Sequence, residues 1–137
     1  MVNHMKMGLR VLALSLLILS NSCLSAEDGL SRVNVDAKRQ MQALAAIKQA
    51  YGKSGHEYDV TLFVTHHLEE LDTKYWIRVA GKPHPSPRQV LGVLVLMNKW
   101  KSDGQEIFDF SLPGDVTQYV LSVKFEDGII REISMES

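Results

Sequence analysis

The feature of this sequence that most constrains its fold is a series of short strand-like stretches near the C-terminus, most of them alternating apolar and polar residues. There are four: "LVLMNKW" (94–100), "EIFDFSL" (106–112), "TQYVLSVKF" (117–125) and "IIREISM" (129–135). "SDGQ" separates the first two and "EDG" the last two, and Asp-Gly between such stretches is a strong hairpin signal. The pattern predicts a four-stranded antiparallel meander with one face buried and one face in water.

The alternation also assigns side chains to the two faces of this sheet. Asp109 and Ser111 are predicted on the water-facing side, and so is Ile130 in the last stretch. The residues predicted to face the core are Phe108, Phe110, Leu112, Tyr119, Leu121, Val123, Phe125, Ile129, Ile133 and Met135. A sheet with one apolar face needs a second layer to cover that face.

Helical spacing upstream supplies this layer. Apolar residues recur three and four positions apart over residues 34–51, and Gly52 follows as a typical helix stop. "GKSG" (52–55) is interpreted as that stop and a turn, because a phosphate-binding loop would need a glycine where the chain has Ile47. "AEDGLS" (26–31) reads as a linker before the helix.

Three more helical segments are expected before the strands. They cover residues 59–71, a short turn within 71–82, and a helix from Ser86 to about residue 94, where "SPRQ" forms a capping box with proline at the first helical position. The predicted fold class is α+β, with N-terminal helices packed on one face of a C-terminal four-stranded antiparallel meander.

The stretch "THHLEEL" is the part of the chain that most resembles a chemical site. As a strand, the segment would place His66 on the apolar face. As a helix, it places His66, Glu69 and Glu70 on the solvent side and His67 on the apolar side. The helix accounts for the apolar spacing of the whole segment and is preferred. His67 is then expected to hydrogen-bond a backbone carbonyl.

Two interpretations of His66, Glu69 and Glu70 remain open. In the first they form a solvated His–Glu pair, which adds about 0.2–0.5 kcal/mol to a helix. In the alternative they form the centre of a metal-dependent or acid–base hydrolase. Zinc needs three or four protein ligands, and the H-E-x-x-H arrangement is missing, so further ligands would have to come from His56 or His84. The sequence predicts no catalytic residue, no cofactor and no metal.

The first 26 residues have the three-part pattern of a secretory signal. Lys6 and Arg10 form a basic segment, "VLALSLLIL" an apolar one, and "SNSCLSA" a small and polar one. The apolar segment is too short to span a bilayer. Cleavage is expected after Ala26, with Ser25 as the alternative. The cut after Ala26 leaves residues 27–137 as a single α+β domain in the periplasm or outside the cell.

Cys23 offers an alternative ending for this signal. A lipoprotein signal ends in a cysteine that becomes acylated, usually with an aliphatic residue three positions earlier, where this chain has Ser20. A lipid anchor at Cys23 is therefore the less favoured alternative. Cleavage after Ala26 leaves no cysteine, so the apolar core has to stabilise the domain without a disulfide.

The charge balance of residues 27–137 narrows the range of partners. This segment keeps 13 basic and all 16 acidic residues, a formal net charge of −3, and has no run of Lys or Arg. Nucleic acid and anionic membrane surfaces are therefore not expected as partners. No second long apolar stretch is present, so no membrane span is expected either.

Three stretches, "FVTHHLEEL", "PSPRQVLGVLVL" and "FDFSLPGDVTQYVLSVKFEDGIIREISMES", resemble in that order a family of uncharacterised bacterial proteins known as domains of unknown function. The resemblance covers roughly residues 40–137, and the final Met-Glu-Ser is its most specific part. It implies small α+β proteins, some of them near polymorphic-toxin loci, where such domains act as immunity proteins. It implies no catalytic residues, since none is established for the family. The secretory signal departs from these relatives and indicates the bacterial envelope.

These observations predict a secreted or periplasmic protein that binds another protein, either a secreted effector or an envelope protein, rather than an enzyme. An immunity- or inhibitor-like module is the first hypothesis. Trp76, His84 and Tyr119 are the candidate interaction residues, because Trp and Tyr are favoured at interface centres and His84 lies in the proline-rich loop "KPHPSP".

Overall fold

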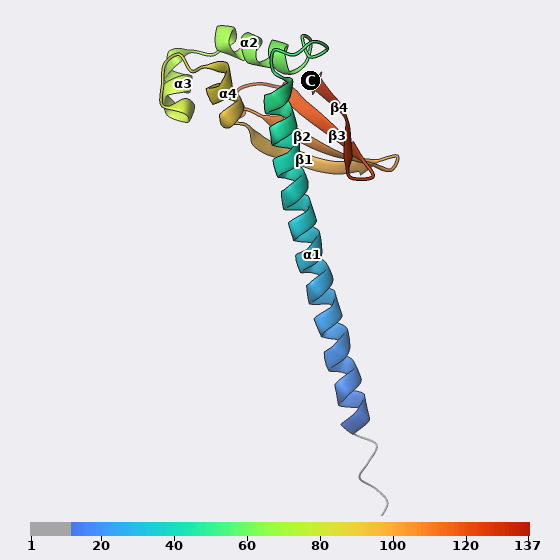
Figure 1. Ribbon diagram of the computed structural model, residues 1–137. Coiled ribbons are helices and arrows are strands. Elements are labelled where there is room, and N and C mark those ends of the chain that lie inside the picture. The colour runs from blue at the N-terminus through green and yellow to red at the C-terminus, as the bar shows by residue number, and fades with distance from the viewer. Residues whose placement is uncertain (1–11) are drawn as a thin grey trace, which may run out of the picture. The chain divides into compact units, whose positions relative to one another are not determined.

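The computed structural model describes the backbone of residues 12–137 and the side chains from residue 28 onward. Four helices precede four strands: α1 (Leu12–Ala50), α2 (Val60–Glu70), α3 (Thr73–Ala80), α4 (Pro87–Gly92), β1 (Val95–Ser102), β2 (Gln105–Ser111), β3 (Val120–Glu126) and β4 (Ile129–Glu136). The chain divides into an N-terminal unit that ends at Lys38 and a second unit, Arg39–Ser137. The second unit contains the last turns of α1 and all later elements (Figure 1).

The helix α1 is longer than the sequence predicts. It was expected to begin near Asn34 after a linker over residues 26–31, but the backbone is helical from Leu12 through that segment. The prediction is wrong because one glycine, Gly29, costs a helix interior only about 1 kcal/mol and does not interrupt it. Of the predicted signal segment, residues 1–11 lie outside the described residues. Within the described part of the chain, no helix has both the length and the apolar content needed to cross a bilayer.

Side-chain caps stabilise the starts of the three short helices, and a glycine ends α3. The carboxylates of Asp59 and Asp72 accept backbone N–H groups in the first turns of α2 and α3. At α4, the Ser86 hydroxyl accepts the N–H of Gln89 at 3.3 Å, and the Gln89 side chain accepts the N–H of Ser86 at 2.8 Å. Gly81 ends α3 with a φ of 73°. The helices predicted over 59–71, within 71–82 and from Ser86 are confirmed.

The strands form one antiparallel sheet in the order β1-β2-β3-β4, as predicted. Asp103 and Gly104 turn the chain between β1 and β2 with φ values of 49° and 76°, and Asp127 and Gly128 do so between β3 and β4 with 52° and 74°. Positive φ at both central residues is the geometry of a type I′ turn, whose twist matches that of the strands. The two Asp-Gly pairs therefore set the register of both outer hairpins.

The core lies between the helices and one face of the sheet, and Figure 1 shows the last turns of α1 lying across the strands. The rings of Phe108 and Phe125 meet edge to face, with centroids 5.3 Å apart. The buried core residues are Ala43, Ile47, Ala50, Val60, Phe63, Val64, Tyr75, Trp76, Val90, Leu91, Leu94, Phe108, Phe110, Leu112, Leu121, Val123 and Phe125. All four helices contribute to it, so the chain is α+β with its helices on one face of a C-terminal meander.

An ion pair joins the edge of the helical layer to the sheet. Arg39 of α1 donates a hydrogen bond to Glu106 of β2, and Lys101 lies 3.6 Å from the same carboxylate. The hydrogen bond from Arg39 holds the pKa of Glu106 below its usual range. The pair therefore strengthens the contact between α1 and β2 while Glu106 is ionised.

The strand β4 departs from the predicted alternation. Its pairing with β3 shifts by one residue beside Phe125, so that Phe125 pairs with Ile130. This β-bulge puts Ile130 against the core together with Ile133, and leaves Ile129 54% exposed beside the turn. The assignment of Ile129 to the core and of Ile130 to water is therefore wrong, because an extra residue in one strand inverts the alternation beyond it.

The bulge predicts that alanine substitutions at two neighbouring isoleucines have different effects on stability. Ile130→Ala is expected to lower the free energy of unfolding by about 1–2 kcal/mol, because it removes methyl groups that pack on the core. Ile129→Ala is expected to change it by less than about 0.5 kcal/mol, since that side chain is exposed. Urea unfolding of both variants tests the register, and a larger loss for Ile129→Ala would contradict the bulge.

Candidate functional site

His67 is a buried polar side chain that is hydrogen-bonded at both ring nitrogens. It is 1% exposed, and its Nδ1–H donates to the carbonyl oxygen of Phe63 at 2.7 Å. A carbonyl accepts only, so Nδ1 carries the proton and Nε2 accepts the hydroxyl of Thr117 at 2.8 Å. The predicted bond from His67 to a backbone carbonyl is confirmed. Burial lowers the pKa of His67, the bond to Phe63 opposes that shift, and the neighbouring His66 adds to it.

A hydroxyl beside an imidazole can act as a nucleophile and its base. In this pair, however, both ring nitrogens of His67 are bonded inside the protein, and the hydroxyl of Thr117 also accepts the N–H of Tyr119 at 3.2 Å. His67 is also only 1% exposed, so its ring has almost no contact with solvent. The pair instead fastens the segment before β3 to α2.

The three residues of the alternative hydrolase centre, His66, Glu69 and Glu70, all lie on α2. His66 is half-buried, and its ring lies edge-on to Tyr119 with centroids 5.2 Å apart. Glu69 and Glu70 are exposed on α2. His66 is therefore less exposed than its predicted position on the solvent side of the helix implies, since the ring of Tyr119 lies against it. Among the described residues, no group of three or more His, Cys, Asp or Glu side chains is placed to hold a metal ion.

The three predicted interaction residues have different surroundings. Trp76 is 2% exposed and belongs to the core, so its prediction as an interaction residue is wrong. A tryptophan is amphipathic, so the sequence alone is compatible with either a core or a surface position. In the structure, α3 places Trp76 in the core. Its indole N–H has no hydrogen-bond partner among the described residues. His84 is exposed in the loop after α3, and Tyr119 is half-buried.

The structure singles out a different aromatic residue, Trp100, on the face of the sheet opposite the helices. The indole N–H of Trp100 donates to Asp109 at 3.0 Å, and the hydroxyl of Ser122 donates to the other oxygen of the same carboxylate. These residues belong to β1, β2 and β3, so one carboxylate links three adjacent strands. The indole remains 43% exposed but has a fixed orientation. We call this group the open-face cluster.

The open face of the sheet is less exposed to solvent than the strand alternation predicts. Ile107, Ser111 and Ser122 are 3%, 2% and 4% exposed, although they point away from the helices. The hydroxyl of Ser111 donates to the carbonyl oxygen of Tyr119 at 2.6 Å, so it is hydrogen-bonded without water. Ser111, predicted on the water-facing side, is on that side but buried. Side chains of neighbouring strands cover the middle of the sheet, because Cβ atoms opposite each other lie only about 5 Å apart.

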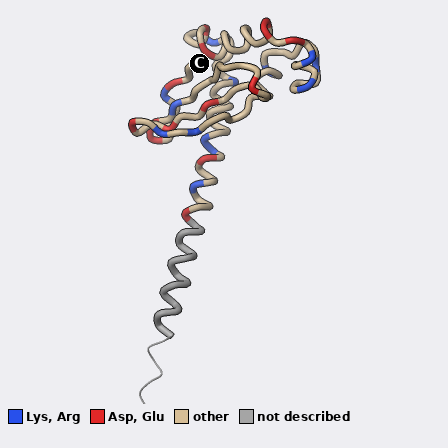
Figure 2. The backbone as a smooth tube through the Cα atoms, turned by 180° about the vertical axis from the view of Figure 1, so that it is seen from behind, with Lys and Arg blue, Asp and Glu red and all other residues tan. Residues whose placement is uncertain are grey.

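The charges of this face are of both signs. Lys124 donates to Glu132 at 3.0 Å across β3 and β4. Figure 2, which views the molecule from behind, shows positions of Lys and Arg intermixed with positions of Asp and Glu along the strands. Such a surface does not attract a highly charged partner.

The edge strand β1 borders the open-face cluster. Val95, Met97 and Trp100 are 39%, 46% and 43% exposed. The register of β1 against β2 shifts between Leu96 and Asn98. A bulge in an edge strand hinders the addition of another strand. The exposed apolar side chains of β1 are therefore better suited to contacts through the face than through the edge.

The sequence contained a signal for the open-face cluster that the strand alternation alone does not reveal. A two-residue Asp-Gly turn pairs Ser102 with Gln105, and counting back from it places Trp100 opposite Ile107. Asp109 is then a diagonal neighbour of Trp100, within reach of a long aromatic side chain. Only the pairing of strands, and not either strand alone, brings the two side chains together.

The fold and this face define a class: a small α+β domain with a helical layer on one side of a meander and an uncovered face on the other. No protein-family model matches the chain, and neither does any curated protein or solved structure. The resemblance to a bacterial family of unknown function therefore stays a prediction.

The buried His67 generates a prediction about pH. Because its pKa is lowered in the folded protein, the unfolded chain binds the proton more strongly, and stability is lost as the pH falls below about 6.5. The variant His67→Gln, which cannot titrate, is expected to lose about 1–3 kcal/mol near neutral pH, since it disturbs buried hydrogen bonds. Its stability should depend less on pH between about 7.5 and 5.5 than that of the unmodified chain. Urea unfolding across this range measures both, and equal slopes would contradict a neutral His67.

Proposed function

We propose that residues 27–137 form a non-enzymatic protein-binding module with an immunity- or inhibitor-like role, acting in the periplasm or outside the cell. The observation that carries this proposal is the open-face cluster, in which a 43% exposed Trp100 is held by Asp109 on the face that the helices leave uncovered. The partner is a protein, either a secreted effector or a component of the envelope.

The physical argument concerns the cost of binding. Tryptophan is the residue type most enriched among side chains that dominate binding energy at protein interfaces. Ordering a free side chain during association costs about 0.5–1.5 kcal/mol. Trp100 is already oriented by Asp109, and Asp109 is itself oriented by Ser122. The cluster therefore presents a large apolar surface in a fixed position.

The surroundings of Trp100 suit an interface of mixed polarity. Val95 and Met97 are further exposed apolar residues of β1, and the ion pair of Lys124 with Glu132 lies on β3 and β4, beyond β2. Protein interfaces commonly combine an apolar centre with a polar rim.

The proposed location rests on the basic, apolar and small-residue segments of the first 26 residues, which have the pattern of a secretory signal. The immunity- or inhibitor-like role rests on the family that the chain resembles.

A comparison of variants in a pull-down tests the binding surface. The tagged chain is used to capture proteins from the envelope fraction of the host, and quantitative mass spectrometry measures the yield. One partner in stoichiometric amount is expected. Trp100→Ala should lower its yield at least about tenfold, because interface tryptophans commonly contribute 2 kcal/mol or more.

Tyr58→Ala is the matched control. Tyr58 is 86% exposed and precedes α2, so this variant also removes an exposed ring, but away from the open face. It should retain the partner in full. Equal yields with the Trp100→Ala and the unmodified protein, or no partner at all for a folded protein, would contradict the proposal.

The proposed export gives a separate prediction. Mass spectrometry of the protein purified from its host should find a mature chain that begins at Glu27, because the small residues before it suit signal cleavage. An acylated Cys23 at the N-terminus would show a lipid anchor instead. An intact Met1 would contradict export through this segment.

A further inference from the structure

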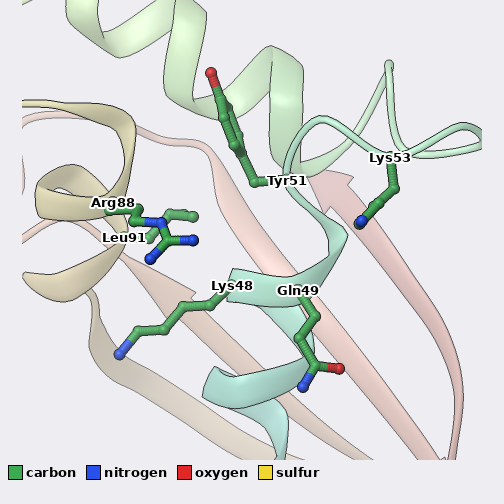
Figure 3. A pocket seen from close by; sticks show the side chains of 6 residues that line it. All are labelled: Lys48, Gln49, Tyr51, Lys53, Arg88 and Leu91. Atoms are coloured by element: carbon green, nitrogen blue, oxygen red, sulfur yellow. The ribbon is translucent and has the colours of Figure 1, made fainter.

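A second feature lies on the helical side of the molecule, between the end of α1 and the start of α4. It is a hollow of about 800 Å³ lined by Lys48, Gln49, Tyr51, Lys53, Arg88 and Leu91. This volume is within the range of small-molecule sites, about 300–1,000 Å³. Three of the lining residues are cations and none is acidic (Figure 3). We call it the basic hollow.

Local structure brings the three cations together from three segments. Lys48 lies in the last turn of α1. Gly52, with a φ of 71°, reverses the chain, and the N–H of Lys53 bonds back to the last carbonyl of α1 at 3.0 Å. The capping box at Ser86 starts α4 and places Arg88 in its first turn. Figure 3 shows the side chain of Arg88 reaching from α4 toward α1, on the same side as that of Lys48.

The positive charge of the basic hollow is uncompensated. Over residues 28–137, Arg39 and Lys124 pair with glutamates, whereas Lys48, Lys53 and Arg88 form no ion pair. The carbonyl end of α1 carries a partial charge of only about −0.5, which does not balance three cations. Like charges around one hollow repel each other, and a bound anion would remove that repulsion.

We propose that the basic hollow binds a small anion that carries two or more phosphate groups. The guanidinium of Arg88 presents paired N–H donors that match two oxygens of one phosphate. Lys48 and Lys53 add point charges from α1 and its following loop, and a second phosphate would give these two lysines an anionic group of their own. Leu91, which is 2% exposed, supplies an apolar wall. This site shares no residue with the open-face cluster, so it does not depend on the proposed protein partner.

Titration calorimetry of the full chain with sodium pyrophosphate tests the site. Binding of one pyrophosphate per chain is expected. Arg88→Gln should weaken it about tenfold, because it removes charge-assisted hydrogen bonds. The double variant Lys48→Gln/Lys53→Gln should weaken it further. All three side chains are exposed, so these variants are expected to fold, which circular dichroism checks.

Lys82→Gln is the matched control, since it removes the same charge from an exposed position in the loop after α3. It should change the affinity for pyrophosphate by less than about twofold, because Lys82 is not among the residues that line the hollow and salt screens an exposed charge. Trp100→Ala should bind pyrophosphate normally, which separates this site from the proposed protein interface. The absence of pyrophosphate binding, or an equal loss for Lys82→Gln and Arg88→Gln, would overturn the proposal.

Discussion

The packing of the last turns of α1 and of α2 onto the aromatic side of β2 and β3 is the interaction on which the rest of the structure depends. Phe108, Phe110 and Phe125 supply that side of the sheet, and each is at most 2% exposed. A four-stranded sheet without this cover would expose the whole row to water, at a cost of about 1.5–3 kcal/mol for each buried side chain of this size. The ion pair of Arg39 with Glu106 adds to the same contact at its edge.

This one-sided packing gives the domain two surfaces of different chemistry. The sheet face that the helices leave free carries Trp100, whose orientation is set by Asp109 through the pairing of β1 with β2. The helical side carries the basic hollow, whose cations come from segments that the shared core holds together. His67 connects the layers, since it belongs to α2 and bonds to Thr117 before β3. Both surfaces therefore follow from the packing of the helices on one face of the sheet.

The predicted site residues fall into two groups. The contacts of one group lie within a single segment, and those of the other come from segments far apart in the chain. The carbonyl partner of His67 lies one helical turn earlier, so the helix alone predicts the bond. His66 is covered by Tyr119, and Trp76 is buried by distant elements, so neither environment followed from helical spacing. The alternation within β1 does not reveal the environment of Trp100, because its hydrogen-bond partner Asp109 lies on another strand. The absence of a Lys/Arg run in the sequence did not exclude a basic cluster in space, as Lys48, Lys53 and Arg88 demonstrate.

The sequence by itself determined the features that depend on a few neighbouring residues. The Asp-Gly turns, the capping box at Ser86 and the α+β order of elements follow from backbone preferences and short-range hydrogen bonds. The tertiary structure alone decided the bulge that exchanges Ile129 for Ile130 in the core, the inward position of Trp76 and the convergence of the three cations. These features depend on contacts between segments far apart in the chain, and periodicity within one segment carries no information about what packs against it.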